Sequence, residues 1–312
     1  MIRRSESSEH TVNTPILFII FNRPETTRLV FERIRQAKPT RLFVSADGPR
    51  SSVPGEAERC REARAIVERV DWDCEVKTFF KDSNCGCRVM VSSAITWFFD
   101  NVEEGIILED DCLPDMSFFP FCAELLERYR DDSRIYMISG NNFQFGIKRG
   151  TGSYYFSKTN HIWGWASWRR AWRQYDVALA SFPEFKRNNI IRNIFSDKKV
   201  RTQCMRNFQL VFNKKLDTWD HQWGYAILTN NGLSIMPNDN LVSNIGFTAG
   251  ATHTTTGGNI FADITTEPIN EIIHPSFVVP DLEADKYERD IYRKAIPFTR
   301  KVRNKLSVLM ER

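Results

Sequence analysis

Four runs of mostly apolar residues divide the first third of the chain, and each is followed by a stretch with helical spacing. The runs cover Pro15 to Phe21, Leu42 to Ala46, Cys74 to Phe80 and Ile106 to Leu108. All four predict strands, and the wholly apolar runs Pro15 to Phe21 and Ile106 to Leu108 are typical of strands buried on both faces of a parallel sheet. The stretches between them predict helices that end near Ala37, that run from about Glu56 to Arg69, and that include Val89, Ile95, Phe98 and Phe99.

Four strand-then-helix units in succession favour an α/β fold with a mostly parallel central sheet, right-handed crossovers and helices on both faces. Polar residues follow each predicted strand: Asn22 and Arg23, then Asp47, then Lys81 and Asp82, then Glu109 to Asp111. The carboxyl ends of parallel strands meet at one edge, so these residues should lie close together. Open sheets of this class bind ligands at that edge.

Glu109, Asp110 and Asp111 place three carboxylates at the end of a buried strand. Like charges this close repel one another unless a cation lies among them. Carboxylate oxygens suit a hard divalent cation such as Mg²⁺ or Mn²⁺. A solvated acidic turn is the alternative, but the apolar strand before the triplet and the helix start at Pro114-Asp115 favour a metal site.

Two common nucleotide-binding signatures do not occur in the sequence. It contains neither Gly-x-Gly-x-x-Gly nor Gly-x-x-x-x-Gly-Lys-Ser/Thr, which argues against dehydrogenases and P-loop ATPases. The 43 basic and 39 acidic residues leave a formal charge of only +4, which argues against general nucleic-acid binding.

The sequence also predicts a cytoplasmic location. No apolar run approaches the roughly 18 residues that a membrane-spanning helix needs. The first fourteen residues are rich in Ser and charge and lack the apolar core of a signal peptide. The seven cysteines are odd in number and have no paired spacing, which is typical of free thiols in a reducing compartment.

Aromatic residues set the second half of the chain apart, because six of the eight tryptophans lie between positions 163 and 223. Trp168 and Trp172 are four residues apart, so they are expected to share one face of a helix in the core. Trp163 and Trp165 flank Gly164 in a predicted loop, where the faces of their rings would be available to a sugar.

Together these landmarks resemble the GT-A glycosyltransferases, and within them the branch typified by N-acetylglucosaminyltransferase I. They are an Arg after the first strand, an Asp after the second, Glu109-Asp110-Asp111, a Gly-Trp segment, Trp219-Asp220 and a late glycine-rich loop that ends in His253. The order matches over roughly residues 14–256. The relatives are secretory-pathway proteins with disulfides and a membrane anchor, neither of which is expected here, so the resemblance leaves the donor sugar and the acceptor open.

The resemblance implies a nucleotide-diphosphate sugar as donor, with UDP favoured. Arg23 and Asp47 would hold the uridine and phosphate end, Asp110 the ribose hydroxyls and Glu109 the donor sugar. Asp111 would be the direct protein ligand of Mn²⁺ or Mg²⁺. His253 would close over the nucleotide. The remaining candidates are Arg88 for the donor, and Trp163, Trp165 and Trp219 for the acceptor.

Inversion at the anomeric carbon requires a carboxylate that removes the proton from the acceptor hydroxyl. Asp220, between Trp219 and Trp223, stands where the resemblance places this base. Asp217 is the substitute, and a helix N-cap is the structural alternative for Asp220.

The predicted function is metal-dependent, inverting transfer of a hexosyl or N-acetylhexosaminyl group to a glycan or lipid-linked acceptor in surface polysaccharide synthesis. One alternative is a nucleotidyltransferase that makes nucleotide sugars, which would normally show a glycine-rich loop with Arg and Lys after the first strand. Another is a non-catalytic carbohydrate-binding protein of the same fold. The predicted parts are a flexible tail (1–14), a nucleotide-sugar-binding half (15–142), an acceptor and catalytic half (143–280) and a basic helical tail (281–312).

The basic tail has two interpretations. Spaced apolar residues among nine Lys and Arg between positions 286 and 312 suit an interfacial helix on anionic lipid at the inner membrane face. The same spacing suits a helix packed on its own domain, and Pro297 interrupts it.

Overall fold

The computed structural model describes residues 12–247, 260–262 and 264–295. Its first part follows the predicted alternation: β1 (Ile16–Ile20), α1 (Pro24–Ala37), β2 (Arg41–Ala46), α2 (Glu56–Val67), β3 (Glu75–Phe80), α3 (Cys87–Asn101) and β4 (Glu104–Glu109). β1 lies between β2 and β4 and is parallel to both, and β3 is parallel to β2. The sheet therefore grows in both directions from β1, and the carboxyl end of β1 is a switch point of the kind where such sheets bind ligands.

The second half of the chain extends this sheet to eight strands in the order β3-β2-β1-β4-β8-β6-β9-β7. The added strands are β6 (Ile135–Ser139), β7 (Tyr154–Ser157), β8 (Trp165–Trp168) and β9 (Leu233–Pro237). β8 is antiparallel to β4 and β6, β9 is parallel to β6, and β7 is antiparallel to β9. All strands except β7 and β8 consequently run the same way, which confirms the predicted mostly parallel α/β sheet.

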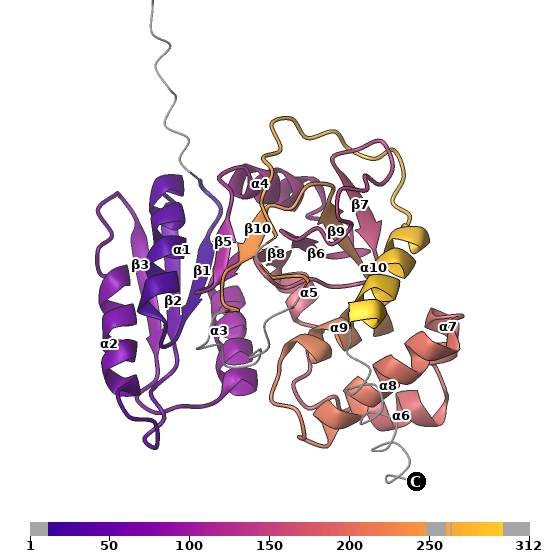
Figure 1. Ribbon diagram of the computed structural model, residues 1–312, viewed down its shortest axis with the longest axis horizontal. Helices are drawn as coiled ribbons and strands as arrows, with labels where there is room; N and C mark the ends of the chain where they lie inside the picture. The colour runs from indigo at the N-terminus through magenta and orange to yellow at the C-terminus, as the bar shows by residue number, and fades with distance from the viewer. Residues whose placement is uncertain (1–11, 248–259, 263, 296–312) are drawn as a thin grey trace, which may run out of the picture.

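Helices cover both faces of the sheet (Figure 1). On one face, residues of α1, α2 and α4 (Phe118–Arg128) belong to one hydrophobic cluster with Ile16, Phe18 and Ile20 of β1. On the other face, residues of α3, α5 (Arg169–Trp172) and α9 (Asp220–Thr229) belong to a second cluster with Leu17 and Ile19. Alternate residues of a strand point to opposite faces, so β1 is buried on both sides, as its continuous apolar run predicts.

A small helical unit packs against α9. It consists of α6 (Phe182–Arg187), α7 (Ile191–Ile194) and α8 (Lys198–Phe212), and its apolar side chains gather around Phe182, Phe208 and Tyr225. Tyr225 belongs to α9, so this unit supports the helix whose first residue is the predicted base, Asp220.

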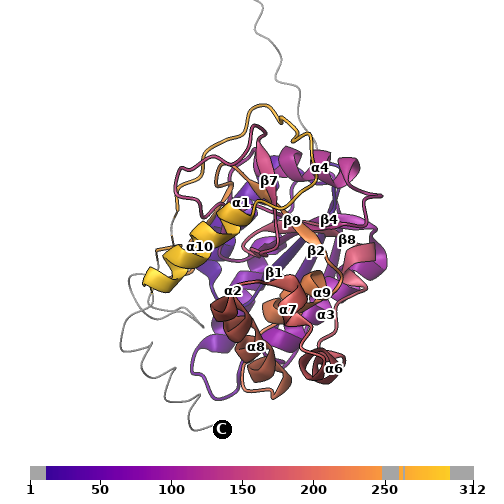
Figure 2. The same cartoon turned by 90° about the vertical axis from the view of Figure 1, so that its right-hand side faces the viewer.

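The last described helix, α10 (Leu282–Ala295), packs beside β7 (Figure 2). Its buried Asp285 accepts hydrogen bonds from Ser157 Oγ at 2.5 Å and from the Lys158 N–H at 3.2 Å. This part of the predicted basic tail therefore packs on its own domain, whereas residues 296–312 lie outside the described residues. Within the described ranges, no helix has the length and apolar character needed to cross a bilayer.

Candidate functional site

A cavity of about 570 Å³ lies at the carboxyl ends of β1, β2 and β4. Arg23, Asp47 and the acidic triplet line it together, as the strand-end pattern predicts. Lys81 and Asp82, which follow the edge strand β3, are not among the residues that line it. The remaining walls come from the start of α3, from residues 217–220 at the start of α9, and from residues 244–247 after β10 (Val242–Asn244).

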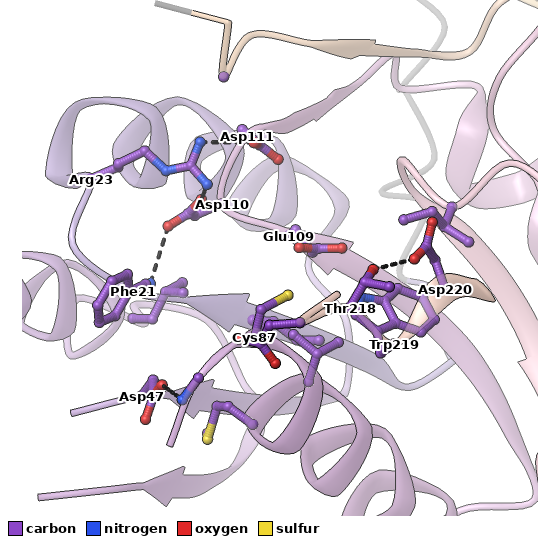
Figure 3. Close-up of a pocket in the computed structure, with 18 of the residues that line it drawn as sticks. Phe21, Arg23, Asp47, Cys87, Glu109, Asp110, Asp111, Thr218, Trp219 and Asp220 are labelled. Carbon is purple, nitrogen blue, oxygen red and sulfur yellow. Dashed lines mark hydrogen bonds and ion pairs between the residues drawn. The ribbon is translucent and has the colours of Figure 1, made fainter. Parts of the chain in front are cut away.

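Arg23 lies among the carboxylates at the end of β4 (Figure 3). Pro24 starts α1 directly after Arg23 and so leaves the Arg23 side chain at the carboxyl end of β1, next to β4. Arg23 Nη1 donates to Asp111 Oδ2 at 2.8 Å, and Nη2 lies 3.0 Å from Asp110 Oδ1. The other Asp110 oxygen accepts a hydrogen bond from the Phe21 N–H at 3.0 Å. A cation therefore does lie among the adjacent acids, and it is a guanidinium that the protein supplies.

Burial is the largest influence on the pKa values of Glu109 and Asp110. It raises the pKa of Glu109 to about 8, and the neighbouring Asp111 and Asp110 add to the increase. Burial also raises the pKa of Asp110 to about 7, against the opposing effect of Arg23. Both groups hold a proton more readily than an exposed acid, so additional positive charge at this end of the cavity would favour their ionised forms.

The backbone of Gly246 packs directly against the acid cluster. β10 pairs antiparallel with β5 (Cys112–Pro114), and the Ile245 N–H donates to the Asp111 carbonyl at 2.9 Å. A Cβ atom at position 246 would lie 2.2 Å from Asp111 Oδ2 and 2.6 Å from Arg23 Nη1. A side chain at this position would have to displace the Asp111 carboxylate and the Arg23 guanidinium, so the glycine that opens the predicted glycine-rich loop has a steric role in the site.

Asp47, at the end of β2, binds the loop that precedes α3. Its Oδ1 accepts hydrogen bonds from the N–H groups of Gly48 and Cys85, each at 2.9 Å. Its Oδ2 accepts one from Asn84 Nδ2 at 2.9 Å and one from the Gly86 N–H at 3.2 Å. Burial raises the pKa of Asp47, and these backbone hydrogen bonds oppose the increase. Both oxygens of the Asp47 carboxylate are therefore engaged in hydrogen bonds within the protein.

Replacing Asp47 with Ala is expected to lower the free energy of unfolding by roughly 2–4 kcal/mol, because several buried donors lose their acceptor. The measurement is urea denaturation followed by tryptophan fluorescence. Asp82→Ala, which removes an exposed carboxylate from the loop between β3 and α3, is the matched control and should change the value by less than about 0.5 kcal/mol. Equal stability of the two variants would contradict the structural role of Asp47.

Asp220 stands on the other side of the cavity from the Arg23 cluster, with Glu109 between them (Figure 3). It is the first residue of α9, and its Oδ1 accepts a hydrogen bond from Thr218 Oγ1. The N-cap residue of α9 is Trp219, which makes no capping hydrogen bond through its side chain. The alternative role of Asp220 as a helix cap is therefore not observed, and its carboxylate lines the cavity.

The Asp217 side chain lies against the amino end of α3. Its Oδ1 accepts a hydrogen bond from the Arg88 N–H at 3.2 Å, where the helix dipole favours a carboxylate. Arg88 contributes its main chain to this contact and is not among the cavity-lining residues. The prediction that the Arg88 side chain holds the donor stays a prediction. His253 lies outside the described residues.

The three candidate acceptor tryptophans have different environments. Trp165 is fully buried and stacks on Trp219, with ring centroids 5.7 Å apart. The expectation that Trp165 meets an acceptor is wrong, because it lies in β8, which pairs with strands on both edges and turns this ring into the core. Trp163 and Trp219 do line the cavity. Trp168 and Trp172 are buried in the core, as predicted, but they do not share a helix face: Trp168 ends β8 and Trp172 lies in α5, and they belong to different hydrophobic clusters.

Several cavity residues do not stand out in the sequence. Arg50 lies in the Asp47-Gly-Pro-Arg turn, where it reads as an ordinary surface arginine. Thr218 has only its position two residues before Asp220 as a signal. Cys87 and Met90 from α3 form part of the wall, and burial raises the pKa of the Cys87 thiol well above its usual range, so it is not an activated nucleophile.

Comparison with known proteins gives little support beyond this geometry. No protein-family model and no curated protein sequence match the chain. Similar solved structures include HddC from Yersinia pseudotuberculosis, with 7% identity over 50% of this chain and 77% of that chain and a TM-score of 0.30. UDP-glucose pyrophosphorylase complexed with UDP-glucose shares 10% identity over 42% and 64% of the two chains, with a TM-score of 0.24.

Mouse xyloside xylosyltransferase 1 in its apo form is 12% identical over 44% of this chain and 55% of that chain, with a TM-score of 0.27. None of these three is an N-acetylglucosaminyltransferase. TM-scores this low transfer neither a fold nor a function, so both rest on the topology and on the contacts of the cavity itself.

Proposed function

We propose that the protein is a metal-dependent, inverting glycosyltransferase that moves a sugar from a nucleoside diphosphate, with UDP favoured, to a glycan or lipid-linked acceptor. One observation carries this proposal. A single cavity holds the Arg23–Asp110–Asp111 cluster at one end, Glu109 in the middle and Asp220 at the other end. This order matches the diphosphate, the sugar and the acceptor hydroxyl of an in-line displacement.

The cluster end suits the leaving diphosphate. The Arg23 guanidinium can pair with phosphate oxygens. Each Asp110 oxygen has one protein partner, Arg23 or the Phe21 N–H, and so keeps a lone pair that can accept from a ribose hydroxyl. No group of three or more His, Cys, Asp or Glu within the described ranges could hold a metal ion by itself. Asp111 lines the cavity and could offer one carboxylate to a cation. Mg²⁺ at phosphate sites is commonly held by one or two carboxylates together with substrate phosphates, so the residues fit a cation shared with the donor.

Asp111 would be the protein ligand of that cation, and a divalent cation bound there would neutralise charge on the leaving diphosphate. Arg23 also reaches Asp111, so the protein places a positive charge at this point even before donor binds. The lack of a side chain at Gly246 keeps the Asp111 carboxylate from being crowded by the segment after β10.

The other end suits the acceptor. Asp220 can remove the proton from an acceptor hydroxyl that attacks the anomeric carbon from the side opposite the diphosphate. Thr218 donates to one Asp220 oxygen and so leaves the second oxygen for the acceptor. Of the candidate aromatic residues, Trp163 lines the cavity and is only partly buried, so its ring would offer a surface to a sugar, whereas Trp219 is 2% exposed and stacks on Trp165.

A thermal-shift screen of nucleotide sugars, each with and without Mn²⁺, tests the donor site. A ligand at about 100 times its dissociation constant should add about 2.7 kcal/mol of stability. The proposal expects stabilisation by at least one nucleoside-diphosphate sugar in the presence of Mn²⁺, followed by slow metal-dependent release of the nucleoside diphosphate. If pyrophosphate release from a nucleoside triphosphate and a sugar 1-phosphate is seen instead, the protein is a nucleotidyltransferase.

A further inference from the structure

We propose that Arg50 and the ring of Phe21 form the nucleobase subsite of the cavity, and that Arg50 contacts the base directly. The inference rests on the proposed function, because it takes the diphosphate to lie at Asp111 and the ribose at Asp110. From there the nucleoside can extend toward β2 or toward β8. The β8 side holds Trp163 and leads to Asp220, which are assigned to the acceptor, so the base extends across the end of β1 toward β2.

Asp47 is the residue at the end of β2 that the resemblance assigns to the uridine. Both of its oxygens already accept hydrogen bonds from the protein: Oδ1 from two N–H groups, and Oδ2 from Asn84 and the Gly86 N–H. Asn84 Nδ2 also donates to the Gly48 carbonyl at 3.1 Å. A base N–H would find no unoccupied oxygen on this carboxylate. Asp47 therefore acts as a positioning residue for the loop, and another group must contact the base.

Arg50 is held in place at this end of the cavity by Glu56, whose side chain is fully buried. Glu56 accepts hydrogen bonds from Arg50 Nη2 at 2.5 Å, from Arg50 Nε at 3.0 Å and from the Arg50 N–H at 2.7 Å. It also accepts one from Asn22 Nδ2 at 2.7 Å, which ties the turn after β2 to the end of β1. A guanidinium fixed by three hydrogen bonds loses little further conformational freedom when it binds a ligand.

Phe21 provides the second flat surface. The Arg50 guanidinium carbon lies 5.7 Å from the centroid of the Phe21 ring, within the range of a cation–π contact. Both side chains line the cavity. Within the described part of the chain, Arg50 Nη1 has no hydrogen-bond partner, whereas Nε and Nη2 are engaged by Glu56. The pair can thus stack a planar base, and Nη1 can donate to one of its carbonyl oxygens.

Isothermal titration with two ligands distinguishes contact with the base from contact with the diphosphate. One ligand is the nucleoside diphosphate that the wild type binds most tightly among UDP, GDP, ADP, CDP and dTDP. The other is inorganic pyrophosphate, and both are measured with Mg²⁺. Arg50→Ala is expected to weaken the nucleotide by about 10- to 100-fold and to leave pyrophosphate within about twofold of wild type. Arg61→Ala removes an exposed arginine from α2 and is the control for lost charge.

An equal loss for both ligands would assign Arg50 to the diphosphate and overturn the proposal, and so would unchanged nucleotide affinity. Arg50→Lys keeps the charge but not the planar group. If Arg50→Ala does not fold, the lysine variant carries the same test, and a selective loss of at least about fivefold for the nucleotide is expected. If the wild type binds none of the five nucleotides, the proposed function itself fails, which is a different result from either of these.

Discussion

Asp220→Asn is expected to lower kcat by two to four orders of magnitude while the affinity for the donor stays unchanged. General-base removal commonly has an effect of about 10²- to 10⁴-fold, because the acceptor hydroxyl must then attack while it still carries its proton. Asn has nearly the same shape as Asp and can still accept the hydrogen bond from Thr218 through its amide oxygen. The start of α9 should therefore keep its structure. Turnover with saturating donor and acceptor, together with donor affinity from titration, measures the two effects separately.

Asp217→Asn is the matched control for this substitution. Asp217 lies three residues earlier, lines the same cavity and accepts a hydrogen bond from the Arg88 N–H. An Asn amide oxygen can replace that acceptor, so the control is expected to lose less than about tenfold in kcat. If Asp217→Asn is inactive and Asp220→Asn turns over normally, the base has been assigned to the wrong carboxylate.

The first half of the sheet could be predicted from the sequence because its inner strands β1, β2 and β4 are buried on both faces, whereas β3 is an exposed edge strand. The inner strands are mostly apolar, as in Ile16–Ile20, and they end abruptly in polar residues. The convergence of Arg23, Asp47 and the acidic triplet then follows from parallel topology alone. In this part of the molecule, the order of apolar runs and polar strand ends in the sequence agrees with the arrangement of the parallel sheet.

The sequence pattern gave a wrong secondary structure where tertiary contacts outweigh local preferences. Trp163-Gly-Trp165 reads as a loop because glycine interrupts an aromatic run, but pairing with β4 and β6 makes β8 a strand from Trp165 onward. The Trp165 ring then packs on Trp219, which is 54 residues away in the chain. A contact over this separation cannot be predicted from the spacing of residues in a short stretch of sequence.

The sequence predicted most of the residues of the site, but not which charged side chains pair with one another. The sequence places an arginine and three acids near one sheet edge, and it does not show that Arg23 bridges Asp110 and Asp111. It likewise does not show that four donors fill the Asp47 carboxylate or that Glu56 fixes Arg50. Side-chain pairs between different strand ends depend on the three-dimensional fold, and only the fold can assign them.

Asp111→Ala is expected to abolish the Mn²⁺-dependent part of stabilisation by a nucleotide sugar. In the protein without ligand, Asp111 Oδ2 is paired with Arg23 Nη1 at 2.8 Å, so a cation must take this oxygen from the guanidinium. That exchange becomes favourable when the donor phosphates pair with Arg23 and add their own oxygens around the cation. Mn²⁺ and donor should therefore stabilise the wild type more together than the sum of their separate effects.

In Asp111→Ala this cooperation should disappear, with a loss of up to about 2.7 kcal/mol at a donor concentration near 100 times the wild-type dissociation constant. The fold should remain cooperative, because Arg23 keeps its ion pair with Asp110 at 3.0 Å. Asp100→Ala removes an exposed carboxylate that does not line the cavity and is the matched control. Differential scanning fluorimetry without ligand, with donor alone, with Mn²⁺ alone and with both gives the four values needed for each protein. If Asp111→Ala keeps the joint effect of Mn²⁺ and donor at the wild-type size, Asp111 is not the metal ligand.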